Sequence, residues 1–206
     1  MEINELNKLL GNIDIYLLDQ ILKGRFTKEM KILDAGCGEG RNCIYFLHQG
    51  YQIFGVDANP IAIQMARIYA QTINPTFDIY KFQTSTIENM PFHAGAFDAI
   101  LCSAVLHFAE SEEAFFKMTN MMMNVLKKEG IFFMRMCTAF GKILEESQQI
   151  GSGRYLLPDG SERFLLTEAL LQKMMEKYDL SYLEPVKTVL VNHQREMGVL
   201  VFQKNS

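Results

Sequence analysis

Short apolar runs alternate along this chain with longer segments in which apolar residues recur every three or four positions. The alternation predicts β-strands separated by amphipathic helices, which is the pattern of a parallel sheet covered by helices. Two apolar segments near residues 181–190 and 196–203 are joined by only a short turn, so we expect them to pair antiparallel. The sequence therefore predicts an α/β fold with a mostly parallel sheet. The expected parallel strands lie near residues 31–35, 52–56, 78–84, 97–102 and 131–136.

Two segments fall outside this alternation. Residues 1–27 show a helical pattern that is interrupted near residue 11, and we interpret them as an N-terminal helical cap. Residues 138–166 form a long connection between a strand and a helix, and long connections are often lids or binding loops. A Pro-Asp-Gly sequence at 158–160 is a strong turn signal and predicts a β-hairpin. We predict a single domain spanning residues 1–206, in which residues 138–166 form an inserted substrate lid.

The most informative residues follow the first predicted strand. Asp34 ends an apolar run, and Gly36, Gly38 and Gly40 follow at alternate positions before a helical segment. Glycine is favoured where a backbone turns sharply or must approach a ligand closely. A second carboxylate, Asp57, ends the next apolar run, and the carboxyl ends of neighbouring parallel strands meet at one edge of a sheet. The combination predicts a nucleoside-binding crevice at that edge. A turn without a ligand would explain the glycines but not the carboxylate.

A dinucleotide site of the nicotinamide type needs its third glycine one position after Gly40, where a small residue lets helix and strand pack closely. That position holds Arg41, which is bulky and charged. The spacing therefore disfavours a pyrophosphate ligand. Two alternatives stay open: an NAD(P)-dependent oxidoreductase, against which Arg41 argues, and a non-catalytic nucleoside-binding or scaffold protein of the same fold.

The glycine motif that begins at Asp34, together with Asp57, resembles the class I S-adenosylmethionine-dependent methyltransferases. Residues 97–107 resemble the fourth strand of that family with its following turn, and residues 86–92 resemble the segment that covers the adenine. The resemblance implies a Rossmann-like, doubly wound, mostly parallel seven-stranded sheet whose last strand is antiparallel. It also implies S-adenosylmethionine as the cofactor and S-adenosylhomocysteine as the product. A shorter similarity, within residues 40–51, is to the tellurite-resistance methyltransferases.

The resemblance further implies which residues contact the cofactor. Gly36 and Gly38 would line the methionine moiety, and the Asp57 carboxylate would accept hydrogen bonds from both ribose hydroxyls. Thr86 stands where the family often has an acidic residue, so we expect a weaker bond from the adenine amino group there, beside the backbone N–H of Ile87. The full set of expected cofactor-binding residues is Asp34, Gly36, Cys37, Gly38, Asp57, Ala58, Thr86, Ile87, Cys102 and Ser103.

The expected chemistry is an in-line displacement, because the cofactor supplies an activated methyl group and the protein has only to align the reactants. His107, just after the fourth strand, is the candidate catalytic residue. It would act either as a general base on an O–H or N–H nucleophile or as part of the pocket wall. Arg154, Tyr155 and Arg163 on the predicted hairpin are the candidate substrate-binding residues, since they would present cations and an aromatic ring to an anionic small molecule. Alternatively, the hairpin is solvated and its arginines pair with neighbouring carboxylates.

Composition narrows the acceptor class. The net charge of −4 and the Cys-Ser-Ala-Val sequence at 102–105, in place of an (Asn/Asp)-Pro-Pro-aromatic motif, argue against a nucleic-acid partner. No apolar run approaches the roughly 20 residues of a bilayer span, and the acidic residues 1–5 lack a signal peptide's basic start. We therefore expect a cytoplasmic protein with no membrane partner. The four cysteines and four histidines have no metal-ligand spacing, so we expect no metal. A small-molecule acceptor is the remaining class, and the sequence specifies neither that molecule nor the oligomeric state.

Overall fold

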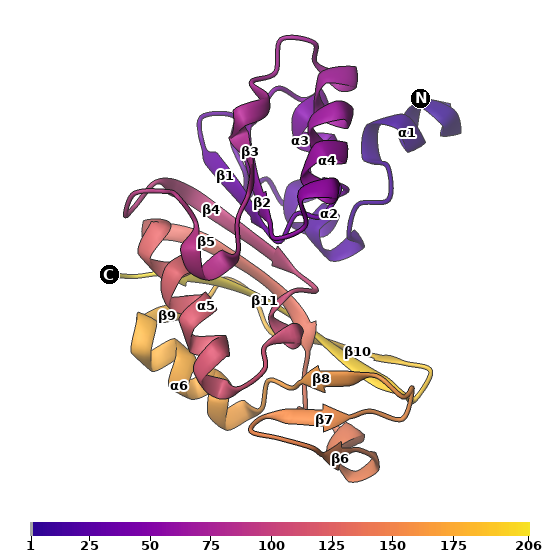
Figure 1. The fold of residues 1–206 in the computed structure, drawn as a ribbon, viewed down its shortest axis with the longest axis vertical. Helices are drawn as coiled ribbons and strands as arrows, with labels where there is room; N and C mark the ends of the chain where they lie inside the picture. Colours follow the sequence, from indigo (N-terminus) through magenta and orange to yellow (C-terminus); the bar gives the residue numbers. More distant parts are fainter. Residues whose placement is uncertain (1) are drawn as a thin grey trace.

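The computed structural model describes residues 2–206 and contains an eight-stranded sheet (Figure 1). The strands follow the order β10-β11-β5-β4-β1-β2-β3, and the short β9 pairs with β11 beside this path. The first five strands are parallel, whereas β11 runs antiparallel to both β5 and β10. This confirms the doubly wound sheet with an antiparallel last strand. The strands are β1 (Lys31–Ala35), β2 (Gln52–Asp57), β3 (Phe82–Thr84), β4 (Phe97–Ser103), β5 (Leu126–Cys137), β9 (Leu180–Tyr182), β10 (Lys187–Val191) and β11 (Arg195–Lys204).

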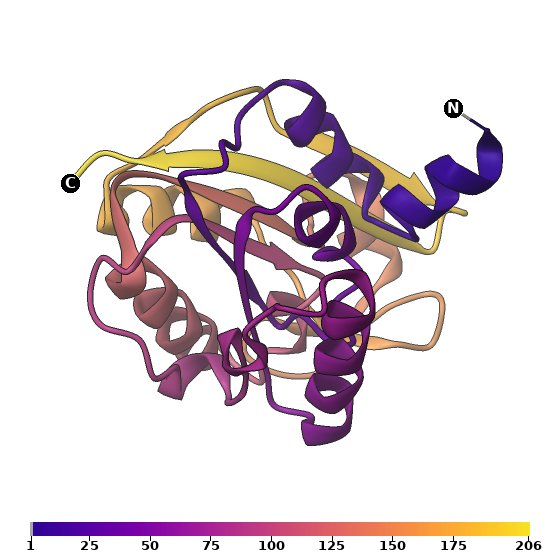
Figure 2. The same cartoon turned by 90° about the horizontal axis from the view of Figure 1, so that it is seen from above.

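Helices pack against both faces of this sheet (Figure 2). The central strands are nearly continuous apolar runs because side chains on both faces are buried, as a parallel sheet requires. One apolar layer lies under α5 and α6, and the other lies under α2, α3 and α4. Within residues 2–206, none of the helices combines the length and apolar composition needed to cross a bilayer. The α-helices are α1 (Ile3–Leu10), α2 (Ile15–Leu22), α3 (Ile44–His48), α4 (Pro60–Ile73), α5 (Glu112–Val125) and α6 (Glu168–Tyr178), and the 3₁₀ helices are η1 (Ile79–Lys81), η2 (Ile87–Asn89), η3 (Leu106–Phe108) and η4 (Lys142–Glu146).

The strand expected near residues 181–190 is interrupted. The structure divides it into β9 and β10, which both pair with β11 but at opposite ends of it. Pro185 lies between the two segments and lacks the backbone N–H that a continuous ladder would need. The interruption lets β10 extend as the free edge of the sheet.

The first helices are fastened to this same region of the chain. Lys23, just after α2, binds Glu184 at 2.6 Å, and Lys187 of β10 binds Asp19 of α2 at 2.8 Å. Gln20 is fully buried and donates a hydrogen bond to Glu184 at 3.0 Å. The helical cap therefore rests on the β9–β10 connection, more than 150 residues away in sequence.

The long connection after β5 forms a small sheet of its own. It contains η4 and three short strands, and β7 and β8 make the hairpin that the Pro-Asp-Gly sequence predicts. Phe164 of β8 is completely buried in the main core, where its ring stacks on Phe115 of α5 with centroids 5.2 Å apart. One side of the hairpin is thus part of the folded core. The additional strands are β6 (Gln148–Gln149), β7 (Arg154–Leu156) and β8 (Glu162–Phe164).

Replacing Phe164 with alanine should destabilise the whole domain, because the change leaves a cavity between the hairpin and α5. We expect the free energy of unfolding, measured by urea denaturation, to fall by about 3–5 kcal/mol. Arg154→Ala on the neighbouring strand is the control, since its ion pair with Glu162 is solvated and is worth about 1 kcal/mol or less. Equal, small losses in both variants would show that the hairpin is not docked in the core.

Candidate active site

The turn after β1 is tied to β2 at the carboxyl edge of the sheet. The N–H groups of residues 36 and 37 donate to the carbonyl of Val56 at 2.8 and 2.9 Å. The carboxylate of Asp57 joins the same turn, because its Oδ2 accepts the N–H of Gly38 at 2.9 Å. Its Oδ1 accepts the N–H of Asn59 at 2.8 Å. Each carboxylate oxygen has two lone pairs, so Asp57 keeps acceptor capacity for a ligand.

Two hollows open at this edge and share Gly36. One, of about 370 Å³, lies over the glycine turn and reaches Asn12 of the helical cap. The other, of about 510 Å³, extends from Asp57 along η2 to the start of α5. Together they form a trough whose first part is lined largely by main chain and polar groups and whose second part is lined by Ile87, Val105 and Met118.

The glycines of the turn have different structural roles. Gly36 has φ +82°, and a Cβ atom there would clash with Val105, which follows β4. Gly38 has φ +54°, and nothing lies within 4 Å of the place where its Cβ would stand. Gly36 is therefore needed for packing, whereas Gly38 leaves bare main chain exposed to the hollow.

This arrangement fits a nucleoside with an amino-acid tail. A bare, polar end suits an amino acid, a carboxylate in the middle suits ribose hydroxyls, and an apolar slot suits a flat base. Arg41 lies on the surface of the first hollow, where its Nη1 donates to the Asn12 carbonyl at 3.5 Å. The residue thus contacts the cap and does not provide the close helix–strand packing of a dinucleotide motif.

Most of the expected cofactor-binding residues line the trough, and two do not. Asp34 is only 1% exposed and accepts a hydrogen bond from the Cys43 thiol at 3.5 Å. Burial raises the pKa of Asp34 to about 7. Cys102 is completely buried in β4. Neither residue lines the trough, and the burial of both side chains disfavours direct contact with a ligand there. The expected residues that do line it are Gly36, Cys37, Gly38, Asp57, Ala58, Thr86, Ile87 and Ser103.

Several trough residues were not expected from the sequence. Asn12 comes from the cap, Asn42 from the turn before α3, and Phe108 and Met118 from η3 and α5. Asn42 directly follows the glycine motif, so its position in the sequence could have identified it as a trough residue. The others come from separate elements and carry no local signature.

His107 is buried beneath the hairpin. Its side chain lies in η3, the residue is 4% exposed, and its Nδ1 has no hydrogen-bond partner within residues 2–206. Burial lowers the pKa of His107 to about 4, and the nearby charges of Arg163, Arg195 and Arg135 act in the same direction. The imidazole is therefore neutral in the folded protein near pH 7.

The three expected substrate-binding residues have different surroundings in the structure. Arg154 forms an ion pair with Glu162 at 2.8 Å, as in the alternative interpretation of a solvated hairpin. Tyr155 is the cross-strand neighbour of Arg163. Arg163 lies over the ring of Phe108 at 4.9 Å, beside His107. Arg163 is thus the one candidate of the three that lies beside His107. The charges of Arg135 and Arg195 also act on His107, and neither residue was expected from the sequence.

Asp14 joins the cap to the carboxyl edge of the sheet. The residue is 6% exposed, and its carboxylate accepts a hydrogen bond from the Ser103 hydroxyl at 3.0 Å. It also pairs with Arg135 at 3.3 Å, and its backbone N–H donates to the Asn42 side chain at 3.1 Å. The cap is thus attached directly to the strand ends that border the first hollow.

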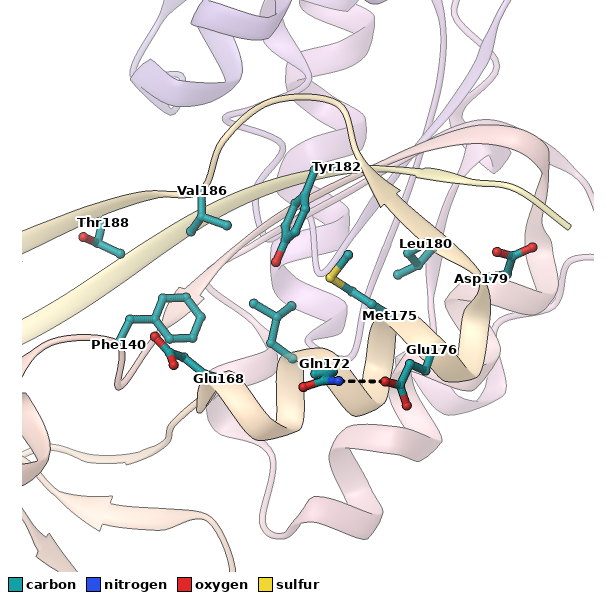
Figure 3. A pocket seen from close by; sticks show the side chains of 11 residues that line it. Phe140, Glu168, Gln172, Met175, Glu176, Asp179, Leu180, Tyr182, Val186 and Thr188 are labelled. Atoms are coloured by element: carbon teal, nitrogen blue, oxygen red, sulfur yellow. Dashed lines mark hydrogen bonds between the residues drawn. The ribbon is translucent and has the colours of Figure 1, made fainter.

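A larger groove of about 790 Å³ lies elsewhere, between α6 and the β9–β10 edge (Figure 3). Leu171, Met175 and Tyr182 give it an apolar floor, while Glu168 and Glu176 stand on its rim. None of the glycine-turn residues lines this groove. The trough at the carboxyl edge is therefore the better candidate for the nucleoside.

Comparison with known proteins agrees with this geometry. Residues 26–184 match the model of a family described as a methyltransferase domain. The chain belongs to this family. The resemblance to class I S-adenosylmethionine-dependent methyltransferases is thereby confirmed, and S-adenosylmethionine is the cofactor of the family.

Individual relatives within this methyltransferase family match parts of the chain. A 2-heptyl-1-hydroxyquinolin-4(1H)-one methyltransferase of Mycobacteroides abscessus is 38% identical over 79 residues, 37% of this chain and 33% of the relative. A ubiquinone biosynthesis O-methyltransferase of Bartonella bacilliformis is 25% identical over 166 residues, 74% of this chain and 64% of the relative. The chain thus spans between a third and two thirds of these relatives.

Solved structures show the same fold. The 1,6-didemethyltoxoflavin-N1-methyltransferase of Burkholderia thailandensis superposes with a TM-score of 0.66 at 19% identity, covering 90% of this chain and 76% of that one. That structure contains 1,6-didemethyltoxoflavin and S-adenosylhomocysteine. At 19% identity the likeness establishes the fold of the present chain alone, so the acceptor of the chain has to be argued from the residues of the chain.

The low pKa of His107 predicts a pH dependence of stability. The unfolded chain takes up a proton at this residue near pH 6.5, whereas the folded protein does so only near pH 4. Between these values the unfolded state binds more protons, so the free energy of unfolding falls as the pH falls. Relative to His107→Gln, which cannot be protonated, the wild type should lose roughly 2 kcal/mol between pH 7 and pH 4.5 in urea denaturation. If the free energies of unfolding of the two proteins changed with pH in parallel, His107 would have its ordinary pKa in the folded protein and the prediction would be wrong.

Proposed function

We propose that this protein transfers a methyl group from S-adenosylmethionine to a small-molecule acceptor by in-line displacement. The observation that carries the proposal is the trough at the carboxyl edge, in which the Asp57 carboxylate and the exposed main chain of Gly38 stand at the junction of a polar and an apolar hollow. The names of the curated relatives support a small acceptor, since both act on low-molecular-weight compounds.

The cofactor would be held by groups in both hollows. Asp57 would bind the ribose hydroxyls, Ile87 and Met118 would contact the adenine, and Gly38 would border the amino-acid end. Ala58 and Thr86 stand beside the ribose and adenine positions. When bound, the cofactor supplies a methyl group on a positively charged sulfur, which needs no covalent help from a protein nucleophile.

The remaining task of the protein is to align the acceptor and keep water out. The cap covers one end of the trough through Asp14, and the hairpin covers the other end through its contacts with η3. We propose that residues 138–166 act as a lid that closes on the acceptor, and that residues 1–27 close on the cofactor.

We further propose that the acceptor carries a negative charge. Arg163 lies at the lid end of the trough and has no carboxylate within ion-pair distance in the described part of the chain. A cationic lid beside a cationic sulfur favours an anion between them. The charge contact is assigned to Arg163 and not to Arg154, because Arg154 is engaged with Glu162. Tyr155, the cross-strand neighbour of Arg163, would supply the aromatic ring.

Asp57→Asn tests the cofactor site. The amide oxygen can still accept the Gly38 N–H, which keeps the glycine turn attached, but the amide NH2 group then faces the Asn59 N–H and that second bond is lost. The charged acceptor for the ribose is lost as well, and thermal unfolding of the variant checks that the fold persists. Because hydrogen bonds to charged groups contribute about 1.5–3 kcal/mol, we expect S-adenosylhomocysteine to bind about tenfold to a hundredfold more weakly in calorimetric titrations.

The matched control is Asp78→Asn, whose side chain caps η1 outside both hollows and keeps its acceptor oxygen. Its affinity for S-adenosylhomocysteine should equal that of the wild type. Unchanged affinity in Asp57→Asn would remove the assigned ribose contact. Wild-type protein that binds NAD or NADP but not S-adenosylhomocysteine would overturn the proposed function.

A further inference from the structure

Three arginines converge on His107 from separate parts of the fold. Arg135 belongs to β5, Arg163 to β8 and Arg195 to β11, and the charge of each acts on the imidazole. In each of them the Nε atom is buried and has no hydrogen-bond partner within residues 2–206, and the same is true of His107 Nδ1. Buried polar atoms are nearly always paired, so this group of unpaired atoms favours an additional partner.

The charges of these arginines are only partly balanced. Arg135 pairs with Asp14, and Arg195 pairs with Asp159 in the hairpin turn. Arg163 pairs with no carboxylate of the described residues, and its Nη1 donates to the carbonyl of the preceding residue at 2.7 Å. A partly buried guanidinium without a counterion is unfavourable, so this group favours an additional anion.

The arginine group adjoins the proposed cofactor trough. Phe108 lines the larger hollow, and Arg163 lies on its ring while His107 contacts it with ring centroids 4.5 Å apart. The carbonyl of Arg135 accepts the N–H of Ala104, which lines the smaller hollow, at 2.7 Å. An anion bound beside the Arg163 guanidinium would therefore lie next to the larger hollow, and β5 carries Arg135 past the smaller one.

We propose that Arg135, Arg163 and Arg195 bind a carboxylate of the methyl acceptor, and that His107 receives the proton from the acceptor atom that is methylated. The inference rests on the proposed function, since it gives the acceptor its place beside the cofactor. Arginine suits a carboxylate because its planar fork makes two parallel charged hydrogen bonds. The acceptor class is then a small carboxylic acid that also carries a hydroxyl or amino group.

The transfer is balanced in atoms and charge. The acceptor oxygen or nitrogen forms a bond to the methyl carbon while the carbon–sulfur bond breaks and its electron pair remains on sulfur. The acceptor proton moves to Nδ1 of His107, so the positive charge of the sulfonium passes to the imidazole. Water takes this proton after the product has left.

The acceptor carboxylate also makes the histidine a better base. Burial lowers the pKa of His107 to about 4, and the guanidinium charges act in the same direction, so the imidazole is a weak base for proton abstraction near pH 7. A negative charge within about 4–6 Å raises such a pKa by about 1–3 units. Binding of the correct acceptor therefore activates the base, whereas an uncharged acceptor leaves it weak. The charged and titratable groups in this cluster are Arg135, Arg163, Arg195, Cys137, Asp14 and Asp159.

His107 is 4% exposed with the hairpin in place, so the part of the hairpin beyond the buried Phe164 has to move for the acceptor to enter. Small anions reach such a site more easily than a full acceptor and can serve as probes. We would record the imidazole NMR signal of His107 against pH in the complex with S-adenosylhomocysteine, with formate, acetate or inorganic phosphate added at increasing concentration. The proteins compared would be the wild type, Arg163→Gln, Arg163→Lys and Arg154→Gln.

We expect formate and acetate to raise the pKa of His107 in the wild type by about one unit or more. Their affinity should fall about tenfold or more in Arg163→Gln, recover in part in Arg163→Lys, and stay unchanged in Arg154→Gln, whose arginine lies on the same hairpin but binds Glu162. S-adenosylhomocysteine should bind all four proteins equally well.

The outcomes separate this inference from the proposed function. If S-adenosylhomocysteine binds but no anion moves the His107 signal, or if Arg163→Gln responds like the wild type, the anion site is refuted and the cofactor site stands. If phosphate alone binds, the carboxylate assignment is wrong. If S-adenosylhomocysteine fails to bind the wild type, the proposed function itself fails.

Discussion

The site depends on the Asp57 carboxylate, which binds the backbone N–H groups of both Gly38 and Asn59 at the carboxyl edge of the sheet. A parallel sheet leaves its strand ends without ladder partners along this edge, and here one side chain satisfies two of the free donors. The same pair of bonds fixes the glycine turn against the end of β2 and positions the start of α4. The Asp57 carboxylate therefore fixes the glycine turn and the start of α4, and it is also the group available to accept hydrogen bonds from a ligand.

Local patterns in the sequence were sufficient for the sheet and for the glycine turn. Gly36 and Gly38 are informative because their backbone conformations are costly for other residues, and Asp57 is informative because it ends a strand. The burial of Asp34 and Cys102 could not be read this way. Both lie near the carboxyl ends of strands, and only the packing of Cys43 and the neighbouring strands shows that they are buried.

The arginines show a second limit of sequence reasoning. Arg135 sits within the apolar run of β5 and Arg195 begins β11, and nothing local distinguishes them from solvated residues. They meet only because β11 returns antiparallel to β5 and because the hairpin folds back over η3. Arg163 was accessible to prediction because it lies next to a turn signal. The proposed cofactor end of the site is therefore set by local backbone chemistry, whereas the proposed acceptor end is set by tertiary contacts.

The attachment of α2 to the β9–β10 connection has a consequence for the folding order. Lys23 and Glu184 are 161 residues apart in sequence, so their ion pair closes a very long loop, which costs more chain entropy than local contacts do. We therefore expect this ion pair to form after β1, β2 and β4 have assembled from closer neighbours. The central sheet can then become compact while Asp14 is still detached from Ser103, and a nascent chain would pass through a stage with its glycine turn uncovered.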